Sequence, residues 1–319
     1  MLRAFIAYLA SAQWARRIIT GWRLSRRVAA RFVAGDTLDE AVGAIKILND
    51  KGMFATLDHL GEHVSTPEES VEASDAYLAL LKRISQDGLK ASVSLKLTQL
   101  GLLLDPDLCF QNVRRVAEQA RLTDSFVRID MEDSSAVDQT LELFSRLRQE
   151  GYMNVGVVIQ SYLFRSDQDL ERLLEIGARI RLVKGAYDEP PDIAYPRKSD
   201  VDASFDRETA MIIRAAIRLG AAPASDDGRH PPITAVGTHD EARIEFARKE
   251  AEAQGLPQRC LEFQLLFGIR SELQESLVEL GYPVRIYVPY GTEWYPYFMR
   301  RLAERPANVW FFISNFFRR

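Results

Sequence analysis

Extended apolar segments and amphipathic segments alternate along this chain, and this alternation limits its fold more than any other feature of the sequence. Eight short runs have the composition of strands, and each is followed by a segment in which apolar residues recur at helical spacing. The predicted strands cover residues 53–58, 91–97, 125–131, 154–160, 179–183, 233–237, 261–265 and 284–288. The predicted helices cover a stretch from Asp36, its expected cap, to about Lys51, and then residues 67–87, 107–122, 135–150, 166–177, 203–219, 239–254, 269–280 and 293–304.

Several of the predicted strands are nearly continuous apolar runs, which is typical of a parallel sheet covered on both faces. At 319 residues, the alternation favours an α/β fold with a closed (β/α)8 TIM barrel over an open doubly wound sheet, which stays the alternative. No GxGxxG motif follows the first strand, and this disfavours a dinucleotide-binding open sheet. We therefore expect an N-terminal helical arm over residues 1–52, a barrel over 53–305 and a C-terminal apolar, helical tail over 306–319.

Polar residues stand at the ends of nearly all the predicted strands. In a parallel barrel these carboxyl ends meet at one face, which is where active sites lie. The residues concerned are Asp58, Lys96, Asp130, Gln160, Arg181, Lys184, Thr238 and His239. Any one of them has a structural interpretation, and His239, for example, could cap the next helix. Together they would carry a large desolvation cost unless they compensate one another, so the pattern predicts a functional site.

An arginine pair follows the last predicted strand. Arg300 and Arg301 lie one helical turn after Tyr297. Two guanidinium groups can bind both oxygens of a carboxylate, which predicts a small anionic substrate. The alternative is a solvated helix on which Arg300 pairs with Glu304 four residues later.

Other strand-end residues suit an anionic cofactor with a flat ring. The small residues Gly185 and Ala186 after Lys184 would let the backbone approach a phosphate or an isoalloxazine ring. Arg181 could stabilise the negative charge of a reduced flavin, and Gln160 could both donate to and accept from its pyrimidine edge.

Composition excludes several classes of partner. The net charge of −4 disfavours a protein that binds polyanions, so we expect no nucleic-acid partner. The two cysteines, Cys109 and Cys260, lack metal-ligand spacing, so we expect no metal, and their small number suits a reducing cytosol. No apolar run reaches the roughly 18 residues that a membrane-spanning helix needs.

Both ends of the chain are unusual. The first 35 residues contain seven arginines and no acidic residue. Three interpretations stay open for this segment, namely a helical arm packed on the domain, a helix on a membrane surface and a targeting segment. Residues 309–319 are rich in aromatic residues and end in two arginines, which suits either a membrane interface or an apolar helix packed on the barrel.

Segments at every predicted strand end, taken in order, resemble those of bacterial monofunctional proline dehydrogenases, the proline oxidase family. The matching segments are TLDHLGE (56–62), SLKLTQLGL (94–102), RIDMED (128–133), VVIQSYL (157–163), RLVKGAYDEP (181–190), GTHD (237–240), EFQLLFGIR (262–270), VRIYVPYG (284–291) and YPYFMRRLAER (295–305). The resemblance implies a distorted TIM barrel with FAD at the carboxyl ends of the strands. It also implies oxidation of L-proline to Δ1-pyrroline-5-carboxylate, the first step of proline degradation to glutamate, with hydride passing from proline C5 to flavin N5 and electrons to a quinone.

The resemblance also implies roles for individual residues. The proline carboxylate would be bound by Arg300 and Arg301 with help from Lys96, while Asp130 would orient Lys96 and Arg301 within an ion network that includes Asp58 and Glu62. Asp130 and Arg181 would be the catalytic residues, and Glu304 would pair with Arg300. The walls around the pyrrolidine ring would be Tyr187, Tyr287, Tyr297 and Leu182. The FAD contacts would be Met131, Gln160, Arg181, Lys184, Gly185, Ala186, Thr238 and His239.

Some points stay open at this stage. The residues identify no base for the proton of the proline amine. Alternative functions are another flavin-dependent barrel oxidoreductase, either folate-reductase-like or a hydroxyproline dehydrogenase, and a barrel that binds an amino acid without catalysis. Tyr297 would crowd a hydroxyl on ring carbon 4, which favours proline over hydroxyproline.

The resemblance leads to expectations about partners as well. It implies a cytoplasmic protein, and electron transfer to a quinone adds peripheral contact at the inner face of the cell membrane. The chain has no room for a second, aldehyde-oxidising domain, so a separate pyrroline-5-carboxylate dehydrogenase would take the product.

Overall fold

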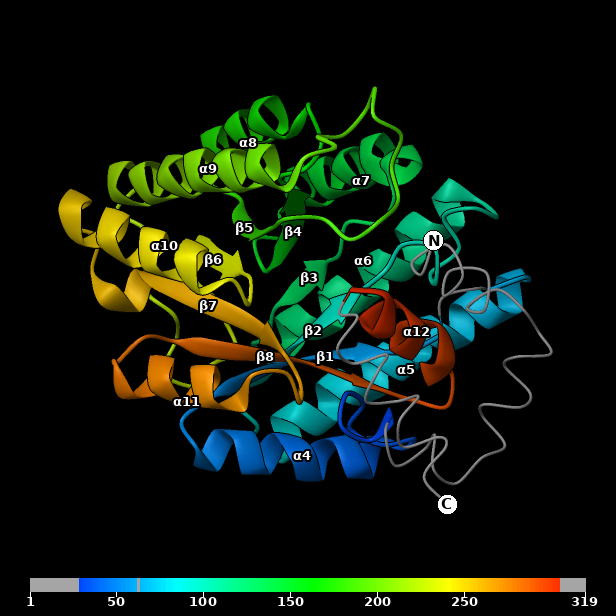
Figure 1. Cartoon of the computed structure of the whole chain (residues 1–319). Helices are drawn as coiled ribbons and strands as arrows, with labels where there is room; N and C mark the ends of the chain where they lie inside the picture. Colours follow the sequence, from blue (N-terminus) through cyan, green and yellow to red (C-terminus); the bar gives the residue numbers. More distant parts are fainter. Residues whose placement is uncertain (1–28, 62–63, 305–319) are drawn as a thin grey trace, which may run out of the picture.

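The computed structural model describes residues 29–61 and 64–304, with side chains as far as Arg301, and these residues form a closed barrel of parallel strands (Figure 1). Each strand pairs with the next, and the last pairs with the first. The strands are β1 (Phe54–His59), β2 (Ala91–Leu95), β3 (Val127–Ile129), β4 (Val155–Gln160), β5 (Arg179–Val183), β6 (Thr234–Gly237), β7 (Leu261–Leu266) and β8 (Val284–Tyr290). The predicted barrel is confirmed, and the open sheet is excluded.

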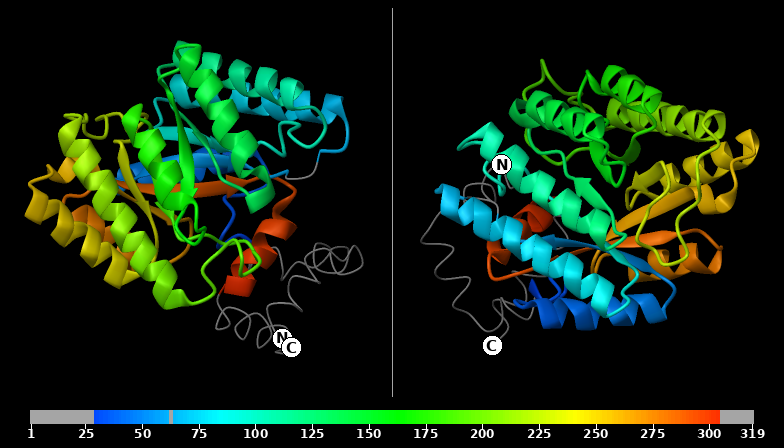
Figure 2. Two further views of the ribbon diagram at one scale, coloured as in Figure 1. Left: turned by 90° about the horizontal axis from the view of Figure 1, so that it is seen from above. Right: turned by 180° about the vertical axis from the view of Figure 1, so that it is seen from behind.

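Helices surround these strands (Figure 2). They are α4 (Leu38–Asp50), α5 (Pro67–Gln86), α6 (Pro106–Leu122), α7 (Val137–Gln149), α8 (Ser166–Glu175), α9 (Lys198–Arg218), α10 (Glu241–Gln254), α11 (Ser271–Glu279) and α12 (Trp294–Glu304), with short 3-10 helices η1 (Ser134–Ala136) and η2 (Gln258–Cys260). Most bounds lie within a few residues of the prediction. The predicted start of α9 at residue 203 was wrong, because Lys198 and Asp202 pair one turn apart and extend the helix toward its N-terminus.

Local signals explain where several helices begin. Thr37, rather than the predicted Asp36, caps α4, and it forms a capping box with Glu40. Thr66 caps α5 and Asp105 caps α6, and in both helices a proline occupies the first turn.

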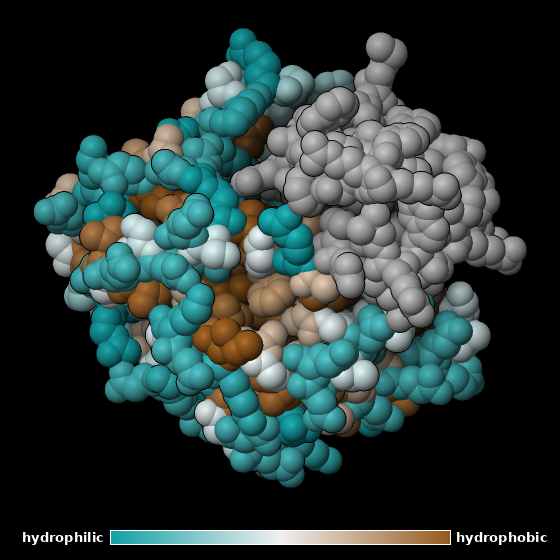
Figure 3. All heavy atoms as spheres, turned by 60° about the horizontal axis from the view of Figure 1, so that its bottom comes forward, coloured by the Kyte–Doolittle hydropathy of each residue, from teal (hydrophilic) through white to brown (hydrophobic). Residues whose placement is uncertain are grey.

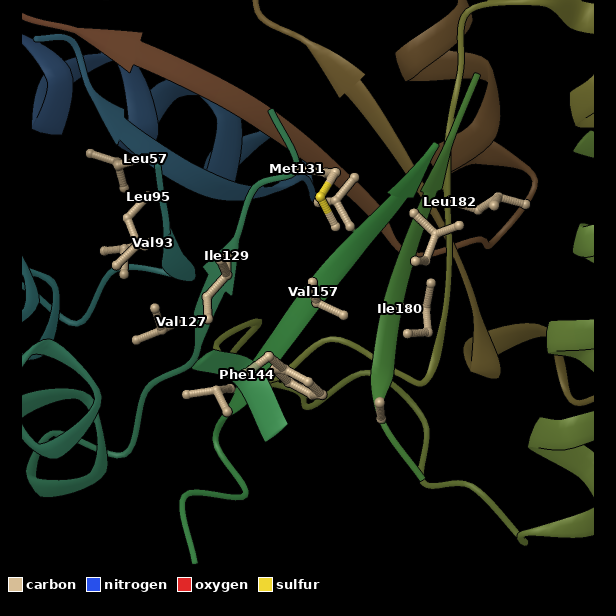
Figure 4. Packing of buried hydrophobic residues seen from close by; sticks show 14 of the residues in the cluster. Leu57, Val93, Leu95, Val127, Ile129, Met131, Phe144, Val157, Ile180 and Leu182 are labelled. Atoms are coloured by element: carbon tan, nitrogen blue, oxygen red, sulfur yellow. The ribbon is translucent and has the colours of Figure 1, made fainter. Parts of the chain in front are cut away.

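The two faces of the strands differ in chemistry. Outward-facing residues such as Leu57, Val93 and Ile129 pack against the helices in one large apolar cluster (Figure 4). The inward face is polar and includes the fully buried Arg285, whose Nε and Nη2 atoms donate to Glu262 at 2.8 and 3.0 Å. Because side chains alternate along a strand, the apolar layer lies outside the barrel and the ionic groups lie within it.

The helices at the two ends of the described chain are placed differently. Helix α4 precedes β1 in the sequence and packs beside both β1 and β8 (Figure 1). Helix α12 carries residues that line a cavity together with strand-end residues. The division into arm, barrel and tail stays a prediction, because residues 1–28 and 305–319 lie outside the described part of the chain.

Candidate active site

A cavity of about 370 Å³ lies at the carboxyl ends of the strands, within the size range of small-molecule and cofactor sites. Its lining includes the predicted residues Lys96, Asp130, Met131, Gln160, Arg181, Lys184, Gly185, Ala186, Tyr187, Thr238, His239, Tyr287, Tyr297, Arg300 and Arg301. A hollow with an apolar base and a mostly hydrophilic rim is visible on one face of the molecule (Figure 3). Side chains from distant parts of the sequence therefore meet at a single site.

Leu182 does not fit its predicted role. It is fully buried in the large apolar cluster between the strands and the helices (Figure 4). Its neighbours Arg181 and Val183 line the cavity instead. Strand alternation places Leu182 on the opposite face from both neighbours, so contact with a substrate ring is not compatible with its position. The side chain of Glu304 and the whole of Glu62 lie outside the described residues, so their predicted pairings are not described.

Further residues line the cavity that had no predicted site role. They are Val158, Val183, Gly237, Gln264, Leu265 and Leu266. Two of them could be predicted from side-chain alternation along their strands. Val158 lies two positions before Gln160 on β4, and Gln264 lies two positions after the inward-facing Glu262 on β7, so each pair faces the same side.

Asp130 is the centre of a hydrogen-bonded network in the cavity wall. Its Oδ1 accepts from Arg181 Nη1 at 2.8 Å, and its Oδ2 accepts from the Tyr287 hydroxyl at 2.7 Å. Lys96 Nζ donates to Asp58 Oδ2 at 2.8 Å and to the Tyr287 hydroxyl at 3.4 Å. Burial and the charge of Asp130 raise the pKa of Tyr287 well above its ordinary value, so this hydroxyl stays protonated and links Asp130 to Lys96.

Arg181 is held from several directions. Besides Asp130, its Nη2 donates to Ser94 Oγ at 2.8 Å and its Nε donates to Gln264 Oε1. Its guanidinium also lies 5.3 Å from the centre of the Tyr287 ring. Protein groups alone therefore fix the orientation of this side chain, which is what a preorganised charge requires.

A second ionic group borders the cavity. Lys184 Nζ donates to Asp240 at 2.6 Å and also contacts Asp202. Burial would raise the pKa of Asp240, but the hydrogen bond and charge of Lys184 outweigh it and lower that pKa to about 2. Asp240, not His239, caps α10, and His239 Nε2 accepts a hydrogen bond from the Leu266 backbone at 3.0 Å. His239 thus has a structural role in addition to lining the cavity.

The wall of the cavity fits a flat, polar-edged ring. Gly185 has a φ of +112°, and a Cβ there would lie 2.2 Å from the Tyr162 ring, so only glycine leaves room for the backbone at this point. Gln160 Nε2 donates to the Glu132 carbonyl at 2.8 Å, which leaves the Gln160 amide oxygen as an acceptor. With apolar surface from Met131 and a fixed cation at Arg181, the residues present fit a flavin ring.

Two kinds of feature are absent from the described ranges. No group of three or more His, Cys, Asp or Glu side chains is placed to hold a metal ion there. Among the same residues, no helix combines the length and apolar character needed to cross a bilayer.

Comparisons with known proteins agree with this geometry. Residues 41–313 match the family model described as proline dehydrogenase. Proline dehydrogenase 2 of Bacillus subtilis (strain 168) is 37% identical over 309 residues, which cover 97% of this chain and 96% of that protein. Proline dehydrogenase of Deinococcus radiodurans is 39% identical over 292 residues, covering 90% of this chain and 89% of the relative.

A solved structure shows the same architecture. The crystal structure of proline utilization A (PutA) from Bdellovibrio bacteriovorus inactivated by N-propargylglycine aligns with a TM-score of 0.78 and 26% identity. The alignment covers 88% of this chain and 33% of that longer one. The family match spans most of the sequence, and the strand-end residues it includes line one cavity. The chain belongs to the proline dehydrogenase family.

Proposed function

We propose that this barrel oxidises L-proline to Δ1-pyrroline-5-carboxylate with FAD as its cofactor and a quinone as the final electron acceptor. The observation that carries the proposal is the cavity itself. It places Arg300 and Arg301, with Lys96, in one chamber with Arg181 and the Gly185 backbone. A site with cations for a carboxylate beside a wall that fits a flavin suits an amino-acid oxidoreductase.

The substrate half of the site orients a small ring. Arg300, Arg301 and Lys96 would bind the carboxylate, while Tyr187, Tyr287 and Tyr297 would surround the pyrrolidine ring. Tyr297 is almost fully buried, so it is a fixed wall. Holding the ring in one orientation removes rotational freedom before the reaction, and this proximity supplies much of the acceleration.

The cofactor half of the site offers hydrogen-bond donors, a cation and a stretch of backbone that a ligand can approach closely. Met131, Gln160, Arg181, Lys184, Gly185, Ala186, Thr238 and His239 would hold FAD. When bound, the flavin accepts the two electrons and the hydrogen removed from substrate carbon C5. Arg181 would lie against the cofactor, and Asp130 would hold Arg181 and Tyr287 in place through the hydrogen bonds described above.

Anaerobic addition of L-proline to the purified yellow protein tests this function. We expect the flavin absorbance to bleach with proline and more slowly with 4-hydroxyproline, because Tyr297 crowds ring carbon 4. A folate-reductase-like enzyme would bleach with NAD(P)H instead, and a binding protein would not bleach at all. Equal bleaching rates with both amino acids would contradict the role of Tyr297 and favour a hydroxyproline dehydrogenase activity.

We infer peripheral contact with a membrane at the cytoplasmic face, because a quinone acceptor dissolves in the bilayer, and a separate pyrroline-5-carboxylate dehydrogenase as the consumer of the product. The support for membrane contact is the basic segment 1–35 and the aromatic tail 309–319. The full chain is expected to sediment with liposomes that contain anionic lipid, and a variant lacking residues 1–28 and 306–319 to stay in the supernatant. Equal sedimentation of the two proteins would show that neither end of the chain makes the membrane contact.

A further inference from the structure

Arg128 is a buried cation that forms no ion pair with a carboxylate among the described residues. It is 1% exposed and lies on β3, where its neighbours Val127 and Ile129 belong to the apolar cluster between the strands and the helices (Figure 4). Side-chain alternation therefore turns Arg128 into the barrel. A guanidinium stays protonated in proteins, so this side chain places a positive charge in the barrel interior.

Neutral groups hold the Arg128 guanidinium in place. Its Nη1 donates to the Val157 carbonyl at 3.2 Å and to the Arg179 carbonyl, and the guanidinium lies 4.9 Å from the centre of the Phe126 ring. Gly156 leaves room for it, since a Cβ at that position would lie 2.6 Å from Arg128 Nη1. Arg128 Nη2 is buried and has no hydrogen-bond partner within the described chain. The surrounding residues thus accommodate this charge without neutralising it.

A charge held in this way lowers the stability of the fold. Burial, and after it the charge of Arg181, lowers the pKa of Arg128 well below its ordinary value. The folded protein therefore disfavours the charged form of this side chain. Residues that cost stability in this manner are typical of functional sites, where activity needs an otherwise unfavourable group.

Arg128 lies one layer below the floor of the cavity. Five cavity residues come from inward-facing strand positions, and the residue two positions earlier on each strand faces the same way, about 6.6 Å deeper. The cavity layer contains Asp130, Val158, Arg181, Gln264 and Tyr287, and the deeper layer contains Arg128, Gly156, Arg179, Glu262 and Arg285.

The deeper layer carries an excess of positive charge. The charged residues that the described strands contribute to it are three arginines and one glutamate, and this glutamate, Glu262, is paired with Arg285. Arg128 and Arg179 donate to backbone carbonyls instead, so no carboxylate of this layer cancels their charges. The cavity therefore lies above a positively charged layer.

We propose that Arg128 favours a negative charge on the flavin ring and thereby raises the reduction potential of the bound flavin. This inference rests on the proposed function, which makes a flavin the occupant of the cavity. A hydride from the substrate adds two electrons and one proton to a neutral flavin ring, which then carries one negative charge. At an effective dielectric constant of about 20, a unit charge about 10 Å away changes an equilibrium constant by roughly tenfold. Arg128 does not line the cavity, so it acts through its charge alone.

The test compares four variants of the full-length, flavin-bound chain. Arg128→Met removes the charge and keeps much of the side-chain volume, and Arg128→Gln removes the charge but keeps a donor for the carbonyls. Arg128→Lys keeps the charge. Phe126→Leu is the matched control, because it changes the packing against the guanidinium and leaves every charge in place. The readout is the midpoint potential of the flavin, measured without proline by anaerobic equilibration with a reference dye.

Both neutral variants are expected to lower the equilibrium constant for flavin reduction roughly tenfold, which corresponds to about 30 mV for a two-electron couple. Arg128→Lys and Phe126→Leu are expected to stay near the wild-type potential. A wild-type potential in either neutral variant would overturn the proposal. Equal lowering by Arg128→Lys or by Phe126→Leu would also overturn it, because packing rather than charge would then be the cause. If the methionine variant does not accumulate, the glutamine variant decides by the same criterion.

Urea unfolding of the same variants separates a role in function from a role in the fold. Arg128→Met is expected to be at least as stable as the wild type, because it removes a buried charge that has no carboxylate partner. A large loss of stability together with an unchanged potential would identify Arg128 as a structural residue and overturn the proposal.

The wild-type protein separates this inference from the proposed function. If the wild type purifies without flavin and does not bind added FAD, the proposed function is wrong. If the wild type binds flavin and is bleached by proline while the neutral variants keep its potential, only the role of Arg128 is wrong.

Discussion

Replacement of Arg301 with methionine is expected to raise the KM for L-proline roughly a hundredfold or more while FAD stays bound. A guanidinium binds a carboxylate through charge-assisted hydrogen bonds, and loss of one partner of such a pair in a partly buried site costs about 2–5 kcal/mol. Methionine keeps most of the volume of the side chain, so α12 should stay packed. Steady-state kinetics and the ratio of flavin to protein measure the two parts of this expectation.

Arg83→Met is the matched control for Arg301→Met. Arg83 forms an exposed ion pair with Asp39 on the outer surface, and its loss should leave proline kinetics unchanged. Unchanged proline kinetics in Arg301→Met would show that Arg301 does not bind the proline carboxylate. Loss of flavin from Arg301→Met would instead indicate that the helix supports the cofactor half of the cavity.

Replacement of Glu262 with methionine is expected to lower the free energy of unfolding by about 3–5 kcal/mol. The pair that Glu262 forms with Arg285 is almost wholly buried, with side-chain exposures of 0% and 1%. Its loss leaves the Arg285 charge inside the barrel with only neutral acceptors, including the Ala55 and Gly228 carbonyls at 3.0 and 2.8 Å. Urea unfolding of the flavin-bound protein, followed by circular dichroism, measures the effect.

The double variant with Met at both Glu262 and Arg285 separates lost charge balance from lost packing. Removing both charges should recover much of the stability, because no unpaired ion is left in the interior. Asp39→Ala, which breaks the exposed pair with Arg83, should cost at most about 1 kcal/mol. Glu262→Met with wild-type stability would show that water or another group solvates Arg285.

The fold was predictable from the sequence because its main determinant is periodic. Apolar strands and amphipathic helices follow one another so regularly that the barrel and most element bounds could be predicted from local patterns. The start of α9 was missed because an ion pair between Lys198 and Asp202 extends it, and a charged segment after Pro196 has no apolar periodicity that would indicate a helix.

The site was only partly predictable. Strand-end position predicted the set of cavity residues well, because the carboxyl ends of the strands meet in any parallel barrel. Leu182 belongs to the matching segment RLVKGAYDEP, but side-chain alternation places it on the outer face of β5, so membership in the segment does not predict contact with the cavity. The links from Asp130 to Tyr287 and from Arg181 to Gln264 join residues more than 80 positions apart, so no local pattern could reveal them.

Helix α4 affects when the barrel can be completed. It is made before β1, yet it packs against β8 as well as β1, and residues of β8 are separated from it by more than half of the chain. During synthesis α4 can therefore pack against β1 but not against β8 until the last strand leaves the ribosome. The pairing of β1 with β8, and the packing of α4 against both strands, is thus expected to be completed only after β8 has been synthesised.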